Sequence, residues 1–245
     1  MLANYHTHTR WCNHANGEIE DYIKEAINKG LKELAITEHV CLDLSSPRRL
    51  RWDTFGDFNK ELDFMKEKYK DQIRIIKGFE CEYFPHYMHK YKMLKEKYNY
   101  ELFVLGQHES IDRDVDFFNT SDRKSIDLYI DQLIEGINTG FFKICAHPDL
   151  IFVSFDEDEY ILKQIDKVYQ ACQDNNVVVE INANGYRFNR GYPNFNSLER
   201  SKKYNVKYII SSDAHEVEHV ADEKVEELKE KVKNMGIEVL DYLGI

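Results

Sequence analysis

The chain has 245 residues, 42% of them hydrophobic, and a formal net charge of −11. This is enough apolar material for a substantial core, but no apolar run approaches the roughly 20 residues that a membrane span needs. The acidic balance argues against an extended basic surface for a nucleic-acid duplex, so we expect no nucleic-acid partner. A small phosphorylated substrate remains compatible, because bound divalent cations can reverse the sign of a site.

No linker, low-complexity tract or internal repeat interrupts the chain, so we expect residues 1–245 to form a single domain. The first residues lack the charged head and apolar stretch of a signal peptide, which predicts a cytoplasmic protein without a membrane partner. The five cysteines are odd in number and no two have C-x-x-C spacing, which argues against disulfides and a thiolate zinc site. Nothing in the sequence indicates an oligomeric state.

Short apolar segments alternate with longer helical patterns along the chain. The expected strands are residues 2–6, 33–37, 73–79, 101–106, 142–146, 177–182 and 207–211. The expected helices are residues 18–30, 54–70, 86–98, 122–139, 158–174, 195–204 and 218–235.

Seven strand–helix units in succession predict a parallel sheet with helical crossovers. Two layouts compete, an open doubly wound sheet and a closed barrel. The open sheet would usually carry a glycine-rich phosphate turn after its first strand, and the sequence has none there. The regular repetition therefore favours the barrel, and in both layouts the chemistry lies at the carboxyl ends of the strands.

Histidines and carboxylates gather at these strand ends. Imidazole and carboxylate together suit zinc, manganese or iron, and metal binding explains why so many strands carry them. One residue separates His6 from His8, and one residue separates Asp213 from His215. This spacing puts both side chains of each pair on one face of an extended segment. The candidate ligands at strand ends are His6, His8, His39, Glu80, His108, His147, Asp213 and His215.

His14 is a possible seventh histidine ligand, from the loop before the first helix. An ordinary polar residue near the start of that helix is an equally good interpretation. The number of candidate ligands is larger than one tetrahedral metal site can use, which predicts a multinuclear centre. The two oxygens of Glu80 could join two ions, which lie ~3.5–4 Å apart in two-metal enzymes. We expect His86, His89 and His219 to be ordinary surface residues.

Several motifs together resemble the PHP (polymerase and histidinol phosphatase) superfamily, over nearly the whole chain. The opening stretch and Glu180-Ile181-Asn182 are most similar to the histidinol-phosphate phosphatase branch. The motifs are Tyr5-His6-Thr7-His8-Thr9, Cys12-x-His14-Ala15-x-Gly17, Thr37-Glu38-His39, Gly78-Phe79-Glu80, Ala146-His147-Pro148-Asp149 and Ser212-Asp213-Ala214-His215.

The resemblance implies a distorted (β/α)7 TIM-like barrel with three divalent ions at the carboxyl-terminal rim of its strands. The ions would be zinc, manganese or iron, and the ligand types do not choose among them. The implied ligand sets are His6, His8, Glu80 and Asp213 for the first ion, Glu80, His108 and His147 for the second, and His14, His39 and His215 for the third.

The resemblance also implies that a segment after the sixth strand brings basic residues to the substrate phosphate. Arg187 matches the expected position best and Arg190 is the second candidate, while two solvated loop arginines are the alternative. Two features depart from the expected pattern. One residue fewer separates Gly106 from His108, and the loop 45–52 carries three arginines, Arg48, Arg49 and Arg51.

The leading hypothesis is a phosphomonoesterase that converts L-histidinol phosphate to L-histidinol through a metal-bridging hydroxide. In it, Asp213 orients or deprotonates the attacking water, or serves only as a ligand, and Arg187 binds the phosphate. The alternatives are a phosphodiesterase or exonuclease acting on nucleic acid, a phosphatase for another small or tyrosine phosphomonoester, and a metal-binding scaffold without activity. An amidohydrolase would need a bridging lysine, for which Lys77 is the nearest candidate.

Overall fold

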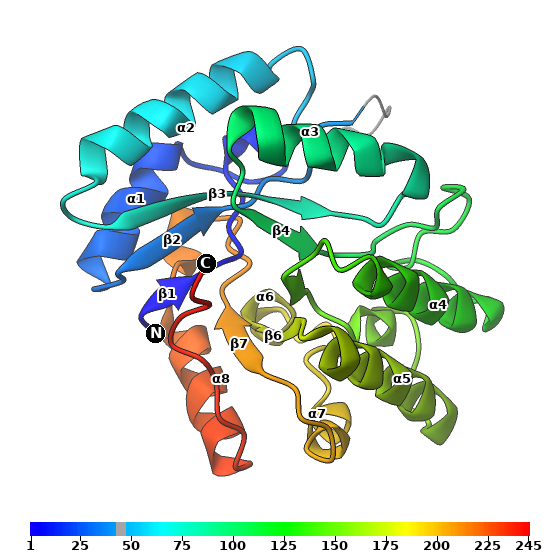
Figure 1. The fold of residues 1–245 in the computed structure, drawn as a ribbon. Helices are drawn as coiled ribbons and strands as arrows, with labels where there is room; N and C mark the ends of the chain where they lie inside the picture. The colour runs from blue at the N-terminus through cyan, green and yellow to red at the C-terminus, as the bar shows by residue number, and fades with distance from the viewer. Residues whose placement is uncertain (43–47) are drawn as a thin grey trace.

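The computed structural model describes residues 1–42 and 48–245, and residues 45–47 of the arginine-bearing loop lie outside them. Seven strands follow one another around the sheet in chain order, and every neighbouring pair is parallel (Figure 1). The strands are β1 Ala3–Asn4, β2 Glu33–Ile36, β3 Arg74–Cys81, β4 Leu102–Leu105, β5 Ile144–Cys145, β6 Val178–Asn182 and β7 Tyr208–Ser211.

The first and last strands meet and nearly close the sheet into a barrel. Beyond their ends, Thr7 and Ala214 form a parallel bridge, and the amide of His8 donates to the carbonyl of Ala214 at 2.9 Å. The amide of Ser212 donates to the side-chain oxygen of Asn4 at 2.8 Å. The predicted distorted (β/α)7 barrel is therefore confirmed, and its closure lies beside the expected metal ligands.

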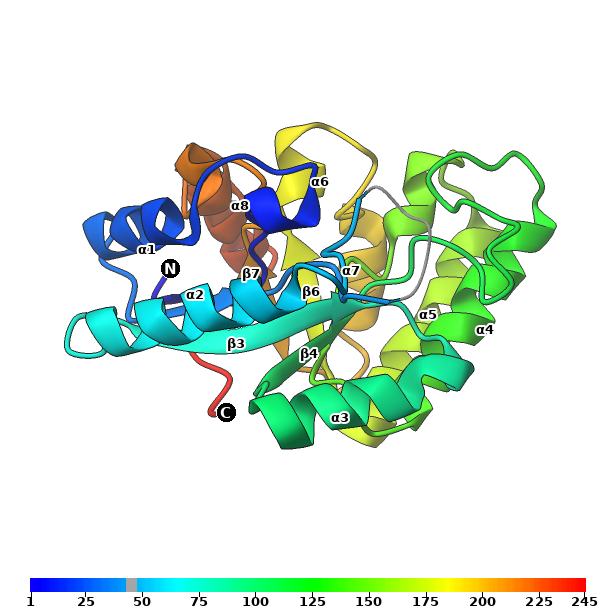
Figure 2. The same ribbon diagram turned by 90° about the horizontal axis from the view of Figure 1, so that it is seen from above.

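Helices connect the strands and cover the outside of the barrel (Figure 2). The sequence pattern did not predict one of these helices, α6. Its five residues begin directly after β6, and the side chain of Asn182 caps its amino-terminal end. None of the helices in the described part of the chain combines the length and the hydrophobicity needed to span a bilayer. The helices are α1 Ile19–Asn28, α2 Phe55–Tyr69, α3 Met88–Tyr98, α4 Lys124–Asn138, α5 Glu159–Asn175, α6 Ala183–Arg187, α7 Phe195–Ser201 and α8 Glu223–Asn234.

Alternation along β3 shows how the barrel places a carboxylate at its rim. Ile76 packs in the interior of the barrel, whereas Ile75 and Phe79 join the core between sheet and helices. Because strand side chains alternate, Glu80 shares the inner face with Ile76 at the carboxyl end of the strand. Lys77 points the other way, where its ammonium donates to Asp63 of α2 at 2.6 Å. It is therefore not available as a bridging lysine of an amidohydrolase.

The opposite end of the barrel is closed by the carboxyl-terminal tail. Leu240, Leu243 and Ile245 pack against the interior cluster, and the amide of Leu240 donates to the carbonyl of Tyr208 at 2.8 Å. The amide of Leu243 donates to the hydroxyl of Tyr5 at 3.0 Å. Figure 1 shows this tail, in red, running between β1 and β7 and ending within the ring of strands. The rim with the ligands is consequently the open end.

Deleting residues 240–245 tests this closure. We expect the free energy of unfolding to fall by roughly 3 kcal/mol, because three half-buried apolar side chains are lost at about 1 kcal/mol each. Urea denaturation measures the loss, and metal content serves as the control, since the tail lies at the end away from the ligands. An unchanged unfolding midpoint would contradict the assigned role of the tail.

Candidate metal centre

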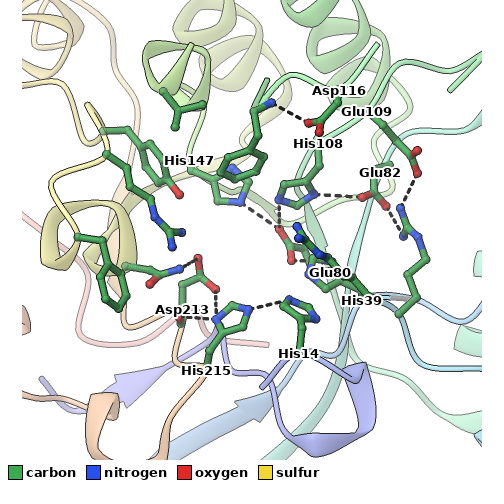
Figure 3. Close-up of a pocket in the computed structure, with 18 of the residues that line it drawn as sticks. His14, His39, Glu80, Glu82, His108, Glu109, Asp116, His147, Asp213 and His215 are labelled. Carbon is green, nitrogen blue, oxygen red and sulfur yellow. Dashed lines mark hydrogen bonds and ion pairs between the residues drawn. The ribbon is translucent and has the colours of Figure 1, made fainter. Parts of the chain in front are cut away.

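All nine predicted ligands lie together at the rim, and Figure 3 shows many of them around one cavity. They come from six of the seven strand ends, with one further histidine from the loop after the first 3-10 helix, Arg10–Cys12. Glu80 lies inside β3 rather than after it, because the strand continues to Cys81. The nine are His6, His8, His14, His39, Glu80, His108, His147, Asp213 and His215.

One oxygen of Glu80 faces a first group of histidines. Its Oε2 lies 3.2 Å from Nε2 of His6, 3.3 Å from Nε2 of His8 and 3.1 Å from Nδ1 of His39. Oδ1 of Asp213 completes this group, at 3.6 Å from Nε2 of His6 and 3.4 Å from Nε2 of His8. Nε2 of His6 and Nε2 of His8 therefore each face both carboxylates, as ligands of a common ion would.

The other oxygen of Glu80 faces a second group. Its Oε1 lies 3.0 Å from Nε2 of His147 and 3.4 Å from Nε2 of His108. A single carboxylate thus stands between two sets of imidazoles, one on each oxygen. This is the arrangement in which a carboxylate can bridge two ions.

A third group lies at the outer side of the first. Nε2 of His14 and Nε2 of His215 are 3.0 Å apart, and the rings of His14 and His39 are stacked with centroids 5.1 Å apart. His8, His39 and His215 also form a compact set of possible ligands. The structure thus brings the three predicted ligands of a third ion together, with His8 at the boundary of two groups.

The polar atoms of these residues are better placed to bind divalent ions than to form hydrogen bonds with one another. Nε2 of His6, both ring nitrogens of His8 and Oδ1 of Asp213 are buried without a hydrogen-bond partner among the described residues. Around zinc at 2.0–2.1 Å, tetrahedral donors lie about 3.4 Å from each other. The separations of 3.0–3.6 Å at this rim match that spacing. Ions held by these atoms would satisfy polar groups that are otherwise costly to bury.

The electrostatics of the centre act differently on its histidines: burial alone would lower the pKa of His6 and of His8, but nearby carboxylates, Asp213 foremost, raise both well above the usual value. Burial alone would raise the pKa of the Glu80 carboxyl, but the surrounding histidines, His6 foremost, hold that pKa well below its usual value. Burial and the neighbouring His8 lower the pKa of His14 to about 4 and that of His215 to about 3. Glu80 is therefore ionised and His14 and His215 are neutral at pH 7, as metal ligation requires, whereas His6 and His8 would release protons when a metal binds.

Buried glutamates hold the outer nitrogens of two candidate ligands. Glu180 accepts from Nδ1 of His6 at 2.7 Å, and Glu82 lies 3.0 Å from Nδ1 of His108. Glu38 lies in a compact buried group with His8 and Cys12, although its carboxylate forms no hydrogen bond with the His8 ring. Partners such as Glu180 and Glu82 fix the tautomer and the direction of a metal-binding imidazole.

The sequence pattern did not predict this role of Glu180 and Glu82. One signal was present for Glu82, because it follows Glu80 by two residues and lies just beyond the end of β3.

Two of the candidate ligands have strained backbones. His147 and Asp213 have positive φ angles of 30° and 44°, which costs a non-glycine residue roughly 1–3 kcal/mol. The surrounding fold holds His147 in place, because its amide donates to Glu180 at 3.1 Å and its carbonyl accepts from the hydroxyl of Tyr129 at 3.0 Å. Strain maintained in this way is typical of a functional site.

Gly106, just beyond β4, leaves room for the central carboxylate. A Cβ atom at this position would overlap Oε1 of Glu80. The glycine is therefore required by the close approach of Glu80 and not by its own backbone angles. The shortened Gly106-Gln107-His108 motif still places His108 next to Glu80.

A cavity of about 670 Å³ opens above the ligands. Arg190 and the buried Tyr192 line it, together with Phe188, whose ring lies 4.9 Å from the guanidinium of Arg190. His219 also lines the cavity, although we expected an ordinary surface residue there. The 3-10 helix Val217–His219 brings it to this wall, and the sequence pattern gave no sign of that turn.

The two candidate phosphate-binding arginines have different surroundings. Arg187 is not part of the cavity wall; its guanidinium pairs with Asp222 at 2.7 Å and donates to the carbonyls of Ser212 and His219. Arg190 lines the cavity and forms no ion pair with a carboxylate of the described residues. The geometry therefore favours Arg190 over Arg187 as a partner of a bound anion.

A seven-stranded barrel with a rim of histidines and carboxylates defines a metal-binding barrel protein. The PHP domain family matches residues 4–184, so the chain belongs to the PHP domain family.

Relatives extend the comparison to nearly the whole chain. A probable histidinol-phosphatase of Schizosaccharomyces pombe is 28% identical over 248 residues, covering 88% of this chain and 81% of that protein. A probable histidinol-phosphatase of Deinococcus radiodurans is 23% identical over 249 residues, covering 96% and 94%. The histidinol phosphate phosphatase of Lactococcus lactis, solved with zinc, L-histidinol and phosphate, has the same fold, with a TM-score of 0.78 at 16% identity, covering 98% of this chain and 95% of that one.

Replacing Glu80 with Gln tests the bridging geometry. We expect both neighbouring metal positions to weaken, by more than the ~10–100-fold loss of affinity typical of outer-shell partners. Metal content by mass spectrometry measures this, and Glu216→Gln, a cavity-wall residue bonded to Asn16, is the matched control. Full metal content in Glu80→Gln would rule out a bridge through this residue.

Proposed function

We propose that this protein is a metal-dependent phosphomonoesterase that hydrolyses L-histidinol phosphate to L-histidinol and phosphate. The observation that carries the proposal is the carboxylate of Glu80 between two sets of imidazoles. The names of the relatives and the ligands of the Lactococcus lactis enzyme support the substrate. We treat residues 1–245 as one catalytic unit, since a single sheet runs through the whole chain.

We assign three divalent ions to the three donor groups at the rim, as zinc, manganese or iron. When bound, such ions lower the pKa of water toward ~7 and neutralise charge on a phosphoryl group. The chain contributes the fixed positions of the donors. Outer partners such as Glu180 and Glu82 hold the imidazoles so that no rearrangement is needed on binding.

Asp213 has a divided role in this proposal. Its Oδ2 accepts hydrogen bonds from the amides of Asn182 at 3.1 Å and Asn184 at 3.2 Å, while Oδ1 faces His6 and His8. The two amides fix the plane of the carboxylate. We assign Oδ1 to the metal and to orienting the attacking water in line with the leaving oxygen.

We assign the substrate phosphate to the part of the cavity next to Arg190. A guanidinium can bind two phosphate oxygens at once and balance the charge that spreads over them during transfer. Phe188 supports the guanidinium from one side. Arg187 instead joins α6 to α8 through Asp222 and so shapes the wall that carries Arg190.

The proposal is tested by purifying the protein without chelator and measuring bound metals and phosphate release. The substrates are L-histidinol phosphate, a panel of other phosphomonoesters including phosphotyrosine, and a single-stranded oligonucleotide. We expect bound divalent ions and the highest kcat/KM for L-histidinol phosphate. Preference for another monoester would keep the mechanism and replace the substrate, whereas cleavage of the oligonucleotide alone would overturn the proposal.

The variants Arg190→Gln and Arg187→Gln distinguish the roles of the two arginines. We expect KM for the phosphomonoester to rise about 10–100-fold with unchanged metal content, because a charge-assisted contact is lost. Arg187→Gln should instead lower the free energy of unfolding by about 1–3 kcal/mol, since it leaves Asp222 half-buried without its partner. The reverse pattern, with KM raised only in Arg187→Gln, would restore Arg187 as the phosphate ligand.

A further inference from the structure

Arg49 is a buried arginine between β2 and α2, with 5% of its surface exposed. Its Nη1 donates to Glu82 at 2.6 Å and its Nη2 donates to Glu109 at 2.8 Å. Glu82 in turn lies 3.0 Å from Nδ1 of His108. A continuous chain of contacts therefore runs from the guanidinium through a carboxylate to an imidazole of the centre (Figure 3).

The backbone beside this guanidinium contacts two other ligand-bearing segments. The carbonyl of Arg49 accepts from the side-chain amide of Asn13, the residue before His14, at 2.8 Å. The amide of Leu50 donates to the carbonyl of His39 at 3.2 Å. Arg49 and Leu50 thus connect three segments that are far apart in the sequence. These segments carry the candidate ligands His14, His39 and His108.

The positive charge of Arg49 is paired with the negative charges of its neighbouring glutamates. One guanidinium faces two carboxylates, and Glu109 is also paired with Arg113 at 3.0 Å. A planar guanidinium can hold two carboxylates at a fixed angle, which a lysine ammonium cannot do in the same way. The side chain also lines the cavity, so contact with the substrate phosphate is the competing role.

We propose that Arg49 is a positioning residue that aligns His108, His39 and His14 for metal binding. It acts through Glu82 on the first of these and through the backbone of residues 49 and 50 on the other two. The inference rests on the proposed trinuclear centre. It assigns a role to part of an arginine-bearing loop that neither the barrel pattern nor the ligand motifs explain.

The experiment is a zinc titration of metal-free protein in competition with a chromophoric chelator, on Arg49→Gln and the parent protein. We expect the parent to bind three zinc ions, and Arg49→Gln to bind at least one of them about 10–100-fold more weakly. At limiting zinc the kcat of Arg49→Gln should fall, and excess zinc should restore it with KM unchanged. Arg51→Gln is the matched control, since Arg51 is exposed and, among residues 1–42 and 48–245, its guanidinium forms an ion pair with Asp53 alone.

Arg49→Lys keeps the charge and decides the matter if Arg49→Gln does not fold, as judged by circular dichroism. We expect Arg49→Lys to bind zinc more weakly than the parent, because one ammonium cannot hold both carboxylates in the same geometry. Parental zinc affinity in the folded variants, with or without a raised KM, would overturn the positioning role. A parent protein that binds no zinc would instead refute the metal centre itself, which separates the two failures.

Discussion

The shared carboxylate of Glu80 is the constraint on which the rest of the site depends. It is 1% exposed, and burying an ionised carboxylate is costly unless positive charge and hydrogen-bond donors surround it. The inner face of β3 sets its position, and the missing side chain of Gly106 gives it space. Histidines from the ends of neighbouring strands then approach both of its oxygens, so the barrel closure and the metal centre are one arrangement.

A second layer of buried charges makes that arrangement rigid. Glu180 supports both a ring nitrogen of His6 and the backbone of His147, and thereby links groups on opposite sides of Glu80. Arg49 and Glu82 perform a comparable task at His108. Pre-set donors need little reorganisation when ions or substrate bind, which is how a protein scaffold contributes to metal-assisted hydrolysis.

Much of the barrel, and the gathering of the candidate ligands at its rim, could be predicted from the sequence, because polar residues at the ends of apolar strands break a regular pattern. Period-two spacing identified pairs such as His6 and His8. The sequence did not reveal α6, the burial of Arg49 or the ion pair that occupies Arg187, because each depends on contacts between distant segments. Loop geometry of this kind is set by the whole fold, and local propensity carries little information about it.

The most direct test of the central claim is to locate the ions themselves by anomalous X-ray diffraction from crystals of the metal-loaded protein. We expect two ions ~3.5–4 Å apart with one oxygen of Glu80 on each, and a third ion near His14 and His215. A single ion, or a Glu80 carboxylate that contacts only one ion, would contradict it.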